Sequence, residues 1–120
     1  MVRSYVAISQ DGAVAGHYAL ERNQSGPVAE GGQAVIDPSH RGRGLLGRMK
    51  NFAVQEAKQL DLIGWYAEAV TVHTLTQNSN NAHGGKLTAV TLAIAPRTET
   101  FDKTYTILKS MIQRFALHFS

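Results

Sequence analysis

Apolar and polar residues alternate with a period of two along the first part of the chain, which is the pattern of a β-strand with one buried face. Residues 2–9 show this alternation, and residues 13–20 repeat it after the pair Asp11-Gly12, a favoured turn between antiparallel strands. A third strand is expected over residues 33–37, after a polar turn cluster. The first third of the chain therefore predicts a hairpin followed by one more strand.

The pattern changes to a spacing of three and four residues between about Gly44 and Leu60, which predicts the longest helix of the chain. Its apolar stripe consists of Leu45, Met49, Phe52, Ala53, Ala57 and Leu60. Residues 63–73 form a long, largely apolar run, as expected of a central strand covered on both faces. Because a strand, a helix and a strand follow one another, we expect strands 33–37 and 63–73 to be parallel.

The last part of the chain has a weaker pattern. Residues 75–83 are polar and weakly helical, and residues 87–94 predict a further strand. The tail allows two interpretations, because residues 105–112 fit a short helix, whereas alternation over residues 114–119 favours a closing strand. The whole pattern predicts an α+β (α/β) fold, with a mixed, mostly antiparallel sheet, a central parallel strand–helix–strand unit, and a single domain over all 120 residues.

Composition narrows the classes of protein that fit. The chain has no cysteine, which excludes disulfides, thiol nucleophiles and thiolate metal sites. The five histidines are scattered and none is spaced with another histidine or a carboxylate as zinc ligands are, so we expect no metal. No apolar run is long enough to cross a membrane and the first residues lack the apolar core of a signal peptide, so the cytoplasm is the expected compartment.

Positive charge is concentrated in one segment. The net charge is +3, and five basic residues fall close together, at Arg41, Arg43, Arg48, Lys50 and Lys58. Such a segment suits an anionic small molecule or a nucleic acid, although Lys50 and Lys58 also fit the solvated face of a helix. A nucleic-acid-binding domain is the weaker alternative, because the chain lacks interleaved aromatic residues and any motif of that class.

The most informative motif is the basic, glycine-rich segment that follows the third strand. Val35-Ile36 end an apolar strand, Asp37-Pro38 stop it, and Arg41-Gly42-Arg43-Gly44 lead into the long helix. Glycine lets the backbone adopt positive φ and approach a ligand closely, and N–H groups at the start of a helix favour an anion. This layout predicts a phosphate-binding loop, and the alternative is an exposed turn that only caps the helix.

The order of a strand, Val-x-Asp-Pro-x-x-Arg-Gly-x-Gly, an amphipathic helix and an apolar strand resembles the GNAT family of N-acetyltransferases. The family's loop signature is Gln/Arg-x-x-Gly-x-Gly/Ala. Arg41 matches its first position and Gly44 its fourth, whereas Leu46 stands where the family prefers glycine or alanine. The resemblance covers roughly residues 2–95 and implies a GNAT-like acyl-CoA N-acyltransferase fold in which the family's N-terminal strand and two helices are missing.

The resemblance also implies acetyl-CoA as the acyl donor and an amine as the acceptor, either a small molecule or a peptide. The backbone at Val35 and Ile36 would contact the pantetheine arm. The backbone N–H groups that would hold the pyrophosphate belong to Arg41, Gly42, Arg43, Gly44, Leu45 and Leu46. The amine attacks the thioester directly, and the enzyme positions the reactants and polarises the carbonyl. The missing edge elements imply an exposed sheet edge, where a homodimer is expected.

A second function stays open beside catalysis, namely a non-catalytic acyl-CoA-binding or regulatory module. The family's second half-site carries a tyrosine acid, and Asn80 stands at that position here. Together with Leu46 and the missing N-terminal elements, this departure supports the non-catalytic alternative. The sequence leaves the acceptor amine open.

Three residues are candidates for proton transfer. Glu30 lies just before the third strand, where members of the family often carry a carboxylate base, but it also fits a surface turn beside Gly31-Gly32. Glu68 lies within an apolar strand and is either a functional carboxylate or a solvent-facing or salt-bridged one. His73 ends that strand where the thioester would lie, and it is either an acid–base group or a structural histidine.

Overall fold

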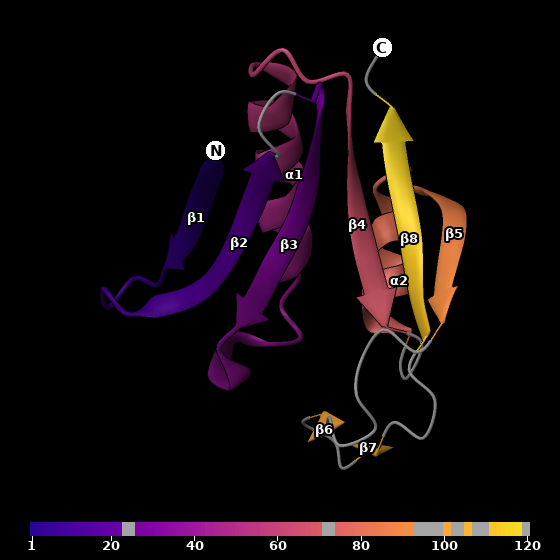
Figure 1. The fold of residues 1–120 in the computed structure, drawn as a ribbon. Coiled ribbons are helices and arrows are strands. Elements are labelled where there is room, and N and C mark those ends of the chain that lie inside the picture. Colours follow the sequence, from indigo (N-terminus) through magenta and orange to yellow (C-terminus); the bar gives the residue numbers. More distant parts are fainter. Residues whose placement is uncertain (23–25, 71–73, 93–99, 102–104, 107–110, 119–120) are drawn as a thin grey trace. The chain divides into compact units, whose positions relative to one another are not determined.

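The computed structural model describes residues 1–22, 26–70, 74–92, 100–101, 105–106 and 111–118 (Figure 1). The chain divides into two compact units, one consisting mainly of Met1–Tyr66 and the other of Ala67–Leu117. Among the described residues, neither helix has the length and apolar character that a membrane span requires.

The first unit is built on a twisted run of strands. β1 (Val2–Ile8), β2 (Val14–Arg22) and β3 (Val28–Ile36) are antiparallel neighbours in that order. β4 (Gly64–Val70) starts beside β3 in the parallel direction, with Val28 opposite Gly64 and Glu30 opposite Tyr66. The predicted hairpin and the predicted parallel pair are therefore both confirmed.

The turn between β1 and β2 follows from its side chains. The Asp11 carboxylate accepts hydrogen bonds from the Ser9 hydroxyl and from the Ala13 N–H, and these bonds lower the pKa of Asp11. Gly12 has a φ of +86°, a conformation that costs glycine little. The sequence pair Asp11-Gly12 thus makes the turn that it predicts.

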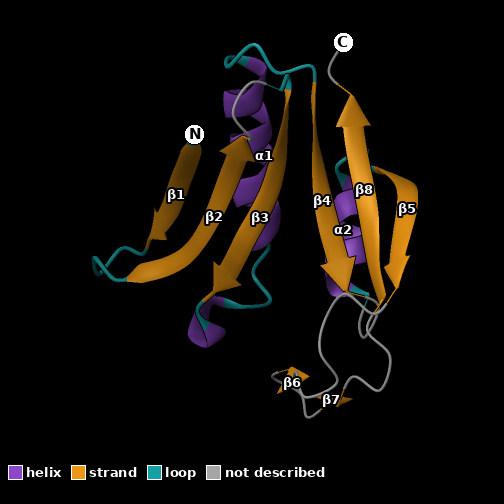
Figure 2. Cartoon of the chain, in the orientation of Figure 1, coloured by secondary structure: helices purple, strands orange, loops and turns teal. Residues whose placement is uncertain are grey.

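One helix covers the first unit. α1 (Leu45–Lys58) packs across β1, β2 and β3 on one face, as Figure 2 shows. Its buried residues Met49, Ala53 and Ala57 join the core cluster with Tyr18 and Leu20 of β2. The predicted apolar stripe is confirmed except at Phe52. The Phe52 ring is 54% exposed and lies outside the core cluster. It packs edge-on against the Tyr5 ring at a centroid distance of 5.3 Å.

The third strand starts five residues earlier than the sequence pattern predicts, at Val28 instead of residue 33. The pair Gly31-Gly32 suggested a turn, but both glycines lie within β3 and Gly31 is buried. A Cβ at Gly31 would meet the Tyr18 hydroxyl and would lie 3.2 Å from Cε3 of Trp65. Gly31 is therefore required by close packing, and the interpretation of Glu30 as a residue before the strand is wrong.

The second unit contains the rest of β4, α2 (Leu75–Ala82), β5 (Lys86–Leu92) and β8 (Met111–His118), with the strand order β4, β8, β5. β5 and β8 are antiparallel. Two short strands, β6 (Thr100–Phe101) and β7 (Tyr105–Thr106), form a separate pair that the sequence did not predict.

The tail of the chain resolves an alternative that the sequence left open. The closing strand is confirmed and begins at Met111, and Tyr105–Thr106 is also extended. A helix over residues 105–112 is therefore wrong for the parts of that range that the structure describes. The predicted fold class is confirmed, because over the described ranges the sheet is mixed and mostly antiparallel, with the parallel pair β3–β4 and the α-helices α1 and α2.

Candidate functional site

The loop after β3 is shaped by a single carboxylate. Asp37 caps a short 3₁₀ helix, η1 (Pro38–His40), by accepting hydrogen bonds from the Ser39 hydroxyl and from the Ser39 N–H at 2.9 Å. These bonds, followed by the His40 ring, lower the pKa of Asp37. The Asp37 N–H also donates to the Ala15 carbonyl of β2 at 2.9 Å. The start of the loop is therefore fixed to the sheet.

Two glycines then turn the chain into α1. Gly42 and Gly44 have φ values of +75° and +72°, which side chains disfavour, and no heavy atom lies within 4 Å of the position of an added Cβ at either. Gly44 is the N-cap of α1 and has no side chain to satisfy the first N–H groups of the helix. The loop thus presents open space at the positive end of a fourteen-residue helix.

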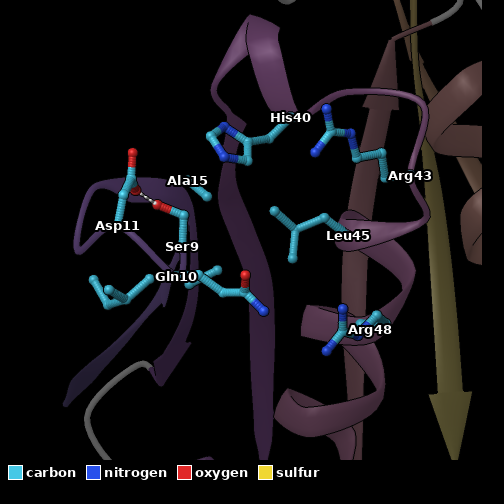
Figure 3. Close-up of a pocket in the computed structure, with 10 residues that line it drawn as sticks. Ser9, Gln10, Asp11, Ala15, His40, Arg43, Leu45 and Arg48 are labelled. Atoms are coloured by element: carbon cyan, nitrogen blue, oxygen red, sulfur yellow. Dashed lines mark hydrogen bonds between the residues drawn. The ribbon is translucent and has the colours of Figure 1, made fainter.

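The two arginines of the loop have different positions. The Arg41 Nε donates to the Ile36 carbonyl at 3.1 Å, so this side chain is tied to the end of β3. Arg43 lines a hollow that it shares with the β1–β2 turn (Figure 3). Leu45 and Leu46, which follow in the first turn of α1, are half-buried and pack against the core cluster.

β3 contains a bulge between the loop and Glu30. His17 lies opposite Val35 and Ala19 opposite Gly32, so Gln33 and Ala34 together face the one residue between them on β2. Gln33 has a φ of +51°, which is unusual outside glycine.

Two side chains of β2 hold this bulge. The His17 Nδ1 lies 2.8 Å from the Gln33 carbonyl oxygen, and the Gln33 side-chain amide donates to the Glu21 carboxylate. Beyond the bulge, Val35 is 61% exposed and Ile36 is half-buried. The bulge therefore changes the direction of the strand just before the residues expected to contact pantetheine.

The three proton-transfer candidates fall in different places. Glu30 is half-buried within β3 and accepts a hydrogen bond from the Tyr66 hydroxyl at 3.2 Å. Glu68 is half-buried on the part of β4 that belongs to the second unit. His73 lies outside the described residues. The structure thus joins Glu30 with Tyr66, a partner that the sequence analysis did not identify.

Sequence reasoning missed several residues of this region. An aromatic residue in an apolar strand suggests the core, which is correct for the buried Trp65 but overlooks the hydroxyl of Tyr66. Only the parallel register of β3 and β4 could have paired Tyr66 with Glu30. The bulge at Gln33 has no signal in the sequence, because glutamine does not favour positive φ. In the part of the chain that the structure describes, no three histidine, aspartate or glutamate side chains are grouped as a metal site requires.

Residues 2–83 match the model of a family described as the acetyltransferase (GNAT) family. No curated protein matches the chain significantly. Among solved structures, an acetyltransferase from Bacillus subtilis in complex with CoA has a TM-score of 0.84 and 17% identity, over 99% of this chain and 78% of that one. The IAA acetyltransferase from Bacillus cereus has a TM-score of 0.82 and 18% identity, over 97% of this chain and 77% of that one.

A third neighbour is the spermidine/spermine N-acetyltransferase from Vibrio cholerae, with a TM-score of 0.77 and 18% identity, over 98% of this chain and 66% of that one. At such identities the likeness establishes the fold, which is that of the acyl-CoA N-acyltransferases. The family match covers more than half of the chain, from the first strand through α2. This chain belongs to the acetyltransferase (GNAT) family.

Proposed function

We propose that this protein binds acetyl-CoA along β3 and the loop that follows it, and transfers the acetyl group to an amine. The observation that carries the proposal is the pair of left-handed glycines, Gly42 and Gly44, with open space above both at the start of α1. Membership of the family supports the reaction class, and a structural neighbour was solved with CoA.

The loop fits a pyrophosphate. Backbone N–H groups from Gly42 to Leu46 would bind its oxygens, and the positive end of the helix would stabilise their charge. The Arg41 N–H donates to the Pro38 carbonyl at 3.4 Å and would have to exchange this long hydrogen bond for one to the ligand. Leu46 departs from the glycine or alanine of the family pattern. Its side chain packs against the core cluster, so its bulk is directed to the protein interior. The departure at Leu46 is therefore compatible with cofactor binding.

The strand fits the pantetheine arm. Val35 and Ile36 follow the bulge at Gln33, and Val35 is largely exposed. Val35 and Ile36 pair with His17 and Gly16 of β2 on one side. In the part of the chain that the structure describes, β4 pairs with β3 only over Val28–Glu30, so the other edge of β3 can pair with the amide groups of an extended ligand. We assign the backbone of Val35 and Ile36 to this contact.

Glu30 is the proposed base. Acetyl-CoA supplies an activated thioester, and the acceptor must lose an ammonium proton before its nitrogen can attack. Glu30 lies on β3 three residues before Gln33, and the Tyr66 hydroxyl at 3.2 Å orients its carboxylate. Glu68 and His73 remain candidates for returning a proton to the leaving thiolate.

The acceptor is proposed only as a class, a small-molecule or peptide amine. One neighbour is named for acting on the amines spermidine and spermine. We expect the reaction in the cytoplasm. A homodimer is also part of the proposal, because the edge strand β1 exposes Val2, Val6 and Ile8.

Calorimetry with acetyl-CoA tests the binding site. Gly44→Ala would weaken the binding of acetyl-CoA by at least about tenfold, or about 1.4 kcal/mol. The added methyl group strains the backbone and occupies the open space over the loop. Gly12→Ala is the matched control, since Gly12 also has positive φ and open space but lies in the β1–β2 turn. Absence of binding to the wild-type protein, or equal losses in both variants, would contradict the proposal.

Turnover on a panel of amines tests the reaction. Glu30→Gln would lower kcat by about 10²-fold or more while leaving acetyl-CoA affinity near the wild-type value. If the wild-type protein binds acetyl-CoA tightly but acetylates no amine, the non-catalytic module is the correct alternative.

A further inference from the structure

A hollow lies between the β1–β2 turn and residues 40–48, and we call it the hairpin pocket. It adjoins the loop proposed for acetyl-CoA and shares Arg43 and Leu45 with it. Its volume is about 820 Å³. The turn contributes Ser9, Gln10 and Asp11, and the opposite wall carries His40, Arg43 and Arg48. In Figure 3 the three basic side chains surround the space above Leu45, and the turn residues close it from the other side. Its size is that of a typical small-molecule site.

The charges of the hairpin pocket are unbalanced. Within the described residues, neither the Arg43 nor the Arg48 guanidinium group has a hydrogen-bond or ion-pair partner. Asp11 is the one acidic residue of the lining, and its carboxylate is engaged by the Ser9 hydroxyl and the Ala13 N–H. Two unpaired guanidinium groups facing one hollow favour an anion, since arginine binds carboxylate and phosphate with two parallel N–H groups.

His40 adds a third contact of defined orientation. Its Nδ1 lies 3.0 Å from the Ser39 hydroxyl and 3.4 Å from the Asp37 carboxylate. The carboxylate therefore occupies one nitrogen of the ring, which leaves Nε2 for the hairpin pocket. Nε2 is therefore available for a hydrogen bond with a bound ligand.

An apolar extension continues from the charged end. A second hollow of about 530 Å³ shares Ala7, Leu45 and Arg48 with the hairpin pocket. It runs along β1 beside the rings of Tyr5 and Phe52, and Phe52 is the most exposed aromatic ring of this wall. Arg48 stands where the two hollows meet. The complete groove is therefore cationic at one end and apolar at the other.

We propose that this groove is a second ligand site, which binds a small amphipathic anion. A phosphate or carboxylate group pairs with Arg43 and Arg48, and an apolar body lies along Leu45, Tyr5 and Phe52. The site uses the side chains of His40, Arg43 and Arg48 and of the β1–β2 turn, whereas the proposed acetyl-CoA site uses the backbone of the loop. Its existence does not depend on acetyl transfer by this chain.

Backbone NMR titration tests the proposal with phenyl phosphate, benzoate and inorganic phosphate as probes. Phenyl phosphate is expected to shift the amide signals of Ala7, Ser9 and Gln10 saturably, in the presence as well as the absence of excess CoA. Arg48→Gln would weaken its binding about tenfold. Lys58→Gln is the control, because Lys58 is an exposed basic residue in the last turn of α1 and lies outside the groove. Benzoate compared with phenyl phosphate tells which anionic group the site prefers.

Several outcomes would overturn the proposal. The first is no saturable shift up to about 20 mM probe, a concentration at which a site with a Kd of about 1 mM is almost fully occupied. The second is a shift limited to the loop at residues 41–46 that CoA abolishes, which would place the probe in the cofactor site. The third is equal binding by wild type and Arg48→Gln. Equal affinity for phenyl phosphate and inorganic phosphate would remove the apolar part of the proposal.

Discussion

Lys50 is fully buried in the middle of α1, with 2% of its surface exposed. It follows Met49 and precedes Ala53 by three positions, so it shares the side of the helix that faces the protein. Burial disfavours the charged ammonium and lowers the pKa of Lys50 to about 8. The expectation of a solvated position is wrong for Lys50, because charge alone does not tell which side of a helix a lysine occupies. Lys58, by contrast, is exposed as expected.

Lys50 should make folding stability depend on pH. Its pKa is lower in the folded chain, about 8, than in the unfolded chain, 10.5, so between these values the unfolded chain binds more protons. Stability therefore rises with pH in this window, by about 1 kcal/mol between pH 7 and pH 9. Urea unfolding at both pH values measures the rise in wild type and in Lys50→Met, where it should vanish. Identical pH dependence in the two proteins would contradict the assignment to Lys50.

The sequence predicts the conformation of the loop residues better than the positions of the side chains on the neighbouring strands. Positive φ was expected at Gly42 and Gly44, because glycine adopts this conformation at little cost where a loop turns into a helix. Both residues have positive φ. Gln33 and Tyr66 were not anticipated. Their positions depend on the register of neighbouring strands, which is a long-range property that no local pattern carries.

At the scale of elements, β3 depends on one glycine. Gly31 leaves space that the Tyr18 hydroxyl and the Trp65 ring fill from the helix side of the sheet. Gly31→Ala should lower the free energy of unfolding by about 2 kcal/mol, because the methyl group would displace two packed aromatic rings. Gly32→Ala is a matched control next in sequence, since no heavy atom lies within 4 Å of its added Cβ. Urea unfolding distinguishes the two, and equal losses would contradict the close-packing explanation.

The clarity of the hydrophobic period explains which elements the sequence could predict. β1, β2 and α1 show clear periods of two or of three to four residues, and their bounds agree with expectation within two residues. The start of β3 was missed because Gly31-Gly32 is a turn signal in sequence and a packing requirement in the structure. β6 and β7 have two residues each, too few for any period to be recognised.

At the scale of the molecule, the family could be recognised from the order of elements around one loop. The match over residues 2–83 confirms that resemblance. The chain covers 66% to 78% of the three structural neighbours described above. The identity of the acceptor amine was not predictable, because it depends on the side chains of the acceptor-binding surface and not on the strand–loop–helix unit.

The edge strand of the first unit predicts the mode of self-association. β1 stands at the end of the strand order and exposes Val2, Val6 and Ile8. An exposed apolar edge strand pairs readily with a second chain. We expect a homodimer through β1.

Sedimentation equilibrium of two matched variants checks this expectation. Val6→Lys should shift the protein to the monomer, because dimerisation through β1 would bury the lysine charge in the interface. Val90→Lys introduces the same charge on an exposed valine of β5 and should leave the dimer intact. Since both valines are exposed in the single chain, neither change should lower its stability by more than about 0.5 kcal/mol. A wild-type monomer at all concentrations, or a dimer that only Val90→Lys disrupts, would exclude association through β1.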